Sequence, residues 1–98
     1  MRAQRYLLVV DATVDSRVED EWNTWYDHEH LPEILGCPGF LSGHRYVHEE
    51  ADGHRRYLAI YELADPEALN TVEFRARRGW RRFAVDVTST TRLFISLQ

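Results

Sequence analysis

The chain has 98 residues, of which 44% are hydrophobic and 29% are charged. These values are ordinary for a globular protein and predict one domain spanning residues 1–98, because a chain of this length has no room for a second core. Its formal net charge of −4 gives no general attraction to nucleic acid. No apolar run approaches the ~20 residues that span a bilayer. We therefore expect neither nucleic acid nor a membrane as a partner.

The cysteine and arginine usage adds two expectations. The single Cys37 cannot form an internal disulfide, which suits a reducing compartment, and the N-terminus shows no basic and apolar signal pattern. Together these features predict a cytoplasmic protein. All twelve basic residues are arginines, and five of them fall within residues 75–82. On a helix, such a run is typical of a solvated face.

The first predicted elements are a strand and a helix. Residues 5–11 (RYLLVVD) form an apolar run rich in β-formers and too short for a helix. Asp15 and Ser16 then offer N-cap oxygens, and an acidic first turn follows them. Pro32 lacks an N–H, so the regular helix is expected to end or kink near His30, before a short helical turn over residues 33–35.

Two more strands, a helix and a final strand follow in the sequence. The patterns predict strands over residues 40–49 and 56–63 that are joined by an Asp-Gly hairpin turn. A helix starts at residues 65–66 and runs to about residue 83, with a break near Gly79. Residues 88–97 form a β-branched last strand. The order βαββαβ predicts a ferredoxin-like α+β fold, an antiparallel four-stranded sheet with both helices on one face.

The predicted strands are apolar on both parities. Residues 6–10 and residues 57–61 are apolar in succession, so both faces of the sheet should be buried. Two helices cover only one face, and the other would be a large exposed apolar patch in a single copy. The sequence therefore predicts a homodimer in which one sheet packs on the other.

The stretch from Trp22 to Glu33 combines three large aromatic residues with two histidines and three carboxylates. His30 lies at the expected helix break, where its ring can point into a pocket, and Tyr26 is its neighbour at i, i+4. Imidazole has the side-chain pKa nearest neutral pH. We predict His30 as the catalytic acid/base, with Tyr26 assisting. The alternative is that His30 only bonds a backbone carbonyl at the break.

Other candidates depend on which way their strands and helices face. His44 shares a strand parity with Tyr46; it is a second catalytic group if that face looks toward the helices, and both are interface residues if it looks toward a partner. The predicted substrate contacts, for which the aromatic residues have core packing as the alternative, are Trp22, Trp25, Glu33, Tyr46, Tyr61 and Trp80. His28 and His30 point in different directions on a helix, so no metal site is predicted.

Three segments together resemble a known family: WYDHEHLPEILGCPGFLSGHRY, YLAIYEL and GWRRF. They are similar to the EthD-like branch of the dimeric α/β-barrel superfamily. The resemblance implies ferredoxin-like monomers whose sheets pair into a barrel, each with a pocket between its sheet and helices. It also implies enzymes that act without metal or organic cofactor on aromatic or polyketide-like compounds, while other branches handle haem. The family motif has a histidine at the position of His30.

These observations leave three functions open. The first is a cofactor-independent enzyme of the cyclase, dehydratase or isomerase type, a lyase-like acid/base catalyst acting on a small aromatic or polycyclic intermediate of natural-product biosynthesis or catabolism. The second is a cofactor-free monooxygenase or a haem-handling protein. The third is a non-catalytic binding protein for an apolar small molecule. We expect the first, with His30 as its proton carrier.

Overall fold

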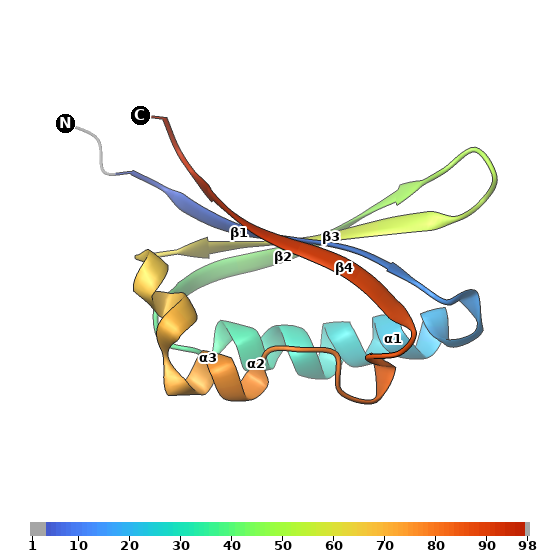
Figure 1. Cartoon of the computed structure of the whole chain (residues 1–98), viewed down its shortest axis with the longest axis horizontal. Coiled ribbons are helices and arrows are strands. Elements are labelled where there is room, and N and C mark those ends of the chain that lie inside the picture. The colour runs from blue at the N-terminus through green and yellow to red at the C-terminus, as the bar shows by residue number, and fades with distance from the viewer. Residues whose placement is uncertain (1–3, 98) are drawn as a thin grey trace.

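The computed structural model describes residues 4–97 and has one four-stranded sheet with helices on one face (Figure 1). Neighbouring strands are antiparallel, in the order β2-β3-β1-β4. The predicted ferredoxin-like α+β fold is therefore confirmed. The strands are β1 (Tyr6–Val14), β2 (Phe40–Glu49), β3 (Arg55–Leu63) and β4 (Val87–Ile95).

The first helical region is continuous, whereas the sequence predicts an end or a kink near His30. After a 3-10 turn (Ser16–Val18), α1 (Glu19–Trp25) continues into a π-helical turn (Tyr26–His30) and then into α2 (Leu31–Leu35). The regular α-helix thus ends before His30, but the backbone remains helical beyond it. Pro32 is tolerated because it lies in the first turn of α2, directly after the widened turn, where its missing N–H matters least.

The second helical region differs from the prediction. The prediction of a single helix from residue 66 to about residue 83 is wrong. The region consists of a 3-10 segment (Pro66–Asn70), α3 (Val72–Arg77) and a 3-10 turn (Arg81–Phe83). Thr71 has an extended backbone, and its hydroxyl accepts a hydrogen bond from the N–H of Phe74 at 3.1 Å, so it caps α3 instead of continuing a helix. The predicted break near Gly79 is present: α3 ends at Arg77, and Gly79 has a φ of 104°.

The core lies between the sheet and the helices. Alternate residues of β3 are buried on this side, and the most deeply buried large side chains are Trp22, Tyr61, Phe83 and Leu63. These residues come from α1, β3 and the last 3-10 turn, so one core joins all the layers. None of the helices within residues 4–97 is long and apolar enough to cross a membrane.

The opposite, helix-free face of the sheet is only partly covered. Leu58 and Ile60 are half-buried there, whereas Tyr46 and Phe94 are each about half exposed, at 52% and 51%. No helix covers this face in Figure 1. The apolar residues that predicted a second buried face therefore form an accessible surface on the single chain.

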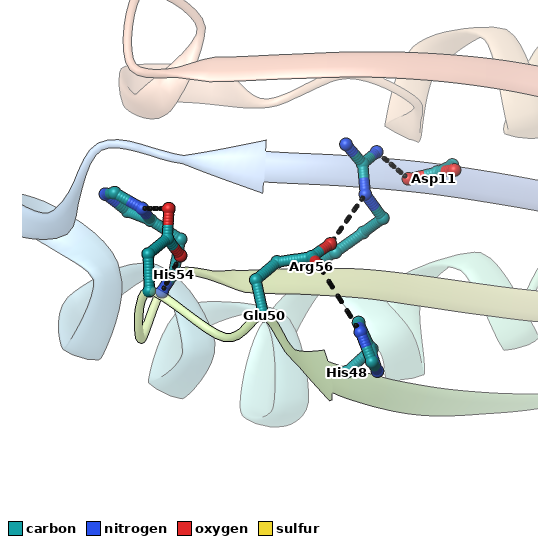
Figure 2. A network of polar contacts seen from close by, with 6 residues as sticks. Asp11, His48, Glu50, His54 and Arg56 are labelled. Carbon is teal, nitrogen blue, oxygen red and sulfur yellow. Dashed lines mark hydrogen bonds and ion pairs between the residues drawn. The ribbon is translucent and has the colours of Figure 1, made fainter.

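Charged side chains border this face at the hairpin between β2 and β3. The Arg56 guanidinium lies 2.8 Å from an Asp11 carboxylate oxygen of β1 and 3.9 Å from Glu50. His48 lies 3.5 Å from Glu50. Figure 2 shows how Asp11, Arg56, Glu50 and His48 follow one another across the strands. The Arg56–Asp11 pair links the hairpin to β1, but an ion pair this exposed contributes little stability.

A glycine in β2 permits the close approach of Tyr61. A Cβ added at Gly43 would lie 2.6 Å from Tyr61 Cδ1 and 3.0 Å from Leu35 Cδ2. We expect Gly43→Ala to destabilise the protein by about 1–3 kcal/mol, because the Tyr61 ring must shift. Urea unfolding measures the change. Gly36→Ala is the control, since a Cβ there meets only ordinary contacts at 3.5 Å; equal stability of both variants would contradict the prediction.

Candidate active site

A cavity of about 550 Å³ lies between the sheet and the helical layer. Its floor is formed by buried residues of the sheet and of the first helical region, and its rim by exposed residues of the segment 69–80 and of β4. Four of the residues predicted for the site line it together: Tyr26, His30, Tyr61 and Trp80. The fold therefore brings these four side chains together from three separate parts of the sequence.

The π-helical turn sets the orientation of His30. Its imidazole stacks on the Trp25 indole, with ring centroids 4.6 Å apart and planes 15° from parallel. In an α-helix, residues five apart point ~140° away from each other and cannot stack. Here the N–H of Leu31 donates to the carbonyl of Tyr26, five residues earlier, and this wider turn brings positions 25 and 30 onto one side.

Aromatic rings surround the imidazole. His30 is only 5% exposed, with the Tyr26 ring edge-on at 4.9 Å and the Trp80 ring at 5.7 Å between centroids. Within residues 4–97, no group hydrogen-bonds to the His30 ring, so the alternative of a bond to a backbone carbonyl does not describe this structure. Its ring nitrogens are free for a ligand.

The surroundings of His30 favour its neutral form. Burial lowers the pKa of His30 to about 4, and the positive charges of Arg81 and Arg45 act in the same direction. At neutral pH the ring therefore carries one N–H and one unprotonated nitrogen. The unprotonated nitrogen can accept a proton, but the lowered pKa makes the ring a weaker base than an ordinary histidine.

Two tyrosines supply a hydrogen-bond donor beside His30. The hydroxyls of Tyr26 and Tyr61 lie 2.9 Å apart in the cavity wall. Burial raises the pKa of both hydroxyls, so both are protonated at neutral pH. One of the two hydrogens lies between the oxygens, whichever is the donor, and the other is free to donate to a bound molecule.

Arg45 of β2 packs against the Tyr26 ring. Its guanidinium lies 4.2 Å from the centre of the Tyr26 ring and binds Asp27 at 2.7 Å and the Asn23 side-chain oxygen at 2.8 Å. The pairing holds a positive charge in the interior. Trp80 is held by a hydrogen bond to β4, because its indole N–H donates to the Ser89 hydroxyl at 3.1 Å.

A family model described as a domain of unknown function, DUF4286, matches residues 5–78. The chain belongs to this family. A search of curated proteins found no match.

Solved structures share the fold over almost the whole chain. SnoaB, a cofactor-independent oxygenase from Streptomyces nogalater, is 20% identical with a TM-score of 0.71, covering 98% of this chain and 96% of that chain. An ethyl tert-butyl ether d (EthD) family protein from Bacillus halodurans is 14% identical with a TM-score of 0.67, covering 95% and 98%. An antibiotic biosynthesis monooxygenase is 15% identical with a TM-score of 0.66, covering 93% and 95%. These likenesses show that the chain has the same fold as these three proteins.

Four predicted substrate contacts lie outside this cavity: Trp22, Trp25, Glu33 and, on β2, Tyr46. Trp22 is fully buried, packed against Tyr26 and Tyr57, and belongs to the core. Trp25 is buried behind the imidazole and supports it without lining the cavity. Glu33 is exposed and lies 3.7 Å from Arg81. For these residues, the structure favours packing or surface roles over contact with a substrate.

The prediction that His44 and Tyr46 join the site needs correction. His44 pairs with Ile60 and Tyr46 with Leu58, and this parity faces away from the helices. Both side chains are exposed on the helix-free face, so the sheet separates them from His30. The intervening residue, Arg45, is the one that points toward the helices and contacts Tyr26.

Sequence reasoning missed the arginines of the site. Arg75 and Arg78 line the cavity, although their arginine-rich segment predicted a solvated face. The residue types of β2 carried no signal for Arg45, because both parities of this strand mix polar and apolar side chains and only the register with β3 decides which side faces the helices. Among residues 4–97, no three His, Cys, Asp or Glu side chains gather in a way that could hold a metal ion.

Proposed function

We propose that this protein is a cofactor-independent enzyme that performs acid/base chemistry on a small aromatic or polycyclic compound. The observation that carries the proposal is the neutral His30 imidazole, free of hydrogen bonds within the described chain, in an aromatic-walled cavity. A ring used only for packing would not need a polar donor pair beside it. The tyrosine pair supplies that donor.

In the proposed reaction, the unprotonated nitrogen of His30 takes a proton from an acidic C–H or O–H of the substrate. The free tyrosine hydrogen donates to the substrate oxygen on which negative charge develops. Arg45 and Arg81 favour that charge, as they disfavour a proton on His30. Returning the proton to a different atom gives isomerisation or cyclisation, and delivering it to a leaving hydroxyl gives dehydration.

A cofactor-free oxygenase is the second candidate, favoured by the likeness in fold to SnoaB. The first step is the same, because the carbanion left after proton removal can give its electrons to O₂. A methylene group and O₂ then yield a carbonyl group and water, with the substrate supplying all four electrons that reduce O₂. The two candidates differ only in the fate of one intermediate.

Liquid chromatography with mass spectrometry of a ligand retained through purification distinguishes these candidates, because an isomer keeps the mass of the ligand but changes its retention time. The ligand is incubated with fresh protein with and without O₂. An isomer or a loss of water without O₂ supports acid/base chemistry, and gain of one oxygen with loss of two hydrogens supports oxygenation. A ligand recovered unchanged under both conditions would favour a binding protein, and a Soret shift on adding haem would favour haem handling.

We also propose that the protein is a homodimer joined through the helix-free face, where Tyr46 and Phe94 are exposed. Phe94→Asp is expected to yield a folded monomer at concentrations where the wild type is dimeric, because it places a charge in the apolar contact. Sedimentation velocity measures the mass. Val85→Asp, at a 92% exposed position outside the sheet, should leave the dimer intact; a monomeric wild type would contradict the proposal.

A further inference from the structure

The charge of the cavity lining differs from that of the chain. The sequence has 16 acidic and 12 basic residues, yet the residues that line the cavity include two arginines, Arg75 and Arg78, and no aspartate or glutamate. Both arginines are exposed, so they lie at the rim. The cavity opening is therefore positive in a protein whose net charge is negative.

The second observation is that neither guanidinium has a carboxylate partner in the described part of the chain. Within residues 4–97, six arginines form ion pairs with carboxylates. Neither Arg75 nor Arg78 has a carboxylate within ion-pair distance in the same part of the chain. Because an arginine offers five donors in a planar fork, an unpaired one at a cavity rim is well suited to bind an oxygen anion.

The local backbone directs the two side chains to the same place. Arg75 lies in α3 and Arg78 directly follows it, and residues three apart share a side of a helix. Phe74 and Trp80 line the same cavity beside them. From the rim inward, the lining changes from two cations to aromatic rings and then to the buried His30 and Tyr26.

We propose that the substrate is an aromatic compound carrying an acidic oxygen group, a carboxylate or an ionised phenol. The acidic group binds Arg75 and Arg78 at the rim, and the aromatic part extends inward toward His30. This inference rests on the proposed function and adds the substrate class to it. It also assigns Arg75 and Arg78 as the residues that select that class.

Binding of a matched pair of probes tests the class. The probes are 2-naphthoate and 2-naphthamide, which have similar shapes and differ in charge, and titration calorimetry measures both affinities. We expect the wild-type protein to bind naphthoate about tenfold more tightly, since two guanidiniums each add a modest, exposed contribution. That preference should shrink as salt is added. Equal affinities, or no binding of naphthoate at millimolar concentration, would overturn the inference.

Substitutions then assign the preference to its residues. The double variant Arg75→Gln with Arg78→Gln is expected to bind naphthoate about tenfold more weakly and naphthamide nearly as the wild type does. Arg82→Gln is the matched control, because Arg82 is exposed nearby but does not line the cavity. A control that loses as much affinity as the double variant would show that only the general positive field matters and would contradict the assignment.

These measurements separate the inference from the proposed function. Binding of the probes requires no turnover, so a charge preference that depends on Arg75 and Arg78 supports the substrate class even if His30 proves dispensable. Conversely, a reaction that depends on His30 without any charge preference would reject the substrate class and leave the enzyme proposal standing.

Discussion

Replacing His30 with glutamine is expected to lower turnover by about 10²–10⁴-fold, the usual contribution of a positioned general base. Glutamine fills similar space and keeps polar atoms in the cavity, but its amide cannot accept a proton at neutral pH. The rate is measured with the compound that the purified protein converts. Circular dichroism and sedimentation should show an unchanged fold and assembly.

His28→Gln is the matched control for this substitution. His28 lies in the same π-helical turn but is exposed and does not line the cavity, so its variant should retain wild-type turnover. If His30→Gln remained fully active, proton transfer by this residue would be rejected. Loss of activity in both variants alike would point to a disturbance of the turn.

Acidification is expected to destabilise the protein through His30 by about 3 kcal/mol. The folded protein holds the pKa of His30 at about 4, whereas the ordinary value is 6.5. Below pH 6.5 the unfolded chain takes up the proton and the folded protein does not. The contribution of this residue is therefore fully present above pH 6.5, decreases as the pH falls toward 4, and changes no further below that value.

Urea unfolding at a series of pH values measures this effect, with His30→Gln as the comparison. The exposed carboxylates also titrate in this range, but they are common to both proteins, so the difference between the two curves isolates His30. Nuclear magnetic resonance of the imidazole protons should give a midpoint near pH 4. An ordinary midpoint near 6.5, with parallel stability curves, would contradict the environment described for this ring.

The sheet was predictable because strand signals are local. Apolar runs, an Asp-Gly turn and β-branched residues mark the four strands to within a residue or two at most ends. The helices were less predictable. Thr71 follows an apparently continuous helical pattern, yet its hydroxyl caps α3, and the choice between continuing and capping depends on how α3 packs through Phe74 on the core.

The candidate site was predictable in its residue types and only partly in its geometry. His30, Tyr26, Tyr61 and Trp80, all proposed from their residue types, line one cavity. The side of β2 that faces the helices could not be read from residue types, because both parities mix polar and apolar side chains. Register with β3 decides it, and that information lies in pairing between residues distant in sequence.

The π-helical turn makes segment length part of the chemistry. If the same five-residue spacing were wound as an ordinary α-helix, the imidazole would point ~140° away from the indole. A homologue with that winding would still show the histidine when the two sequences are aligned, yet its ring would point elsewhere, whereas a homologue with one residue fewer between Trp25 and His30 would keep the two rings on one side at i, i+4. Assigning the role of His30 to a residue in another member of DUF4286 therefore requires comparing the number of residues and the winding of this helix, as well as the residue types in the alignment.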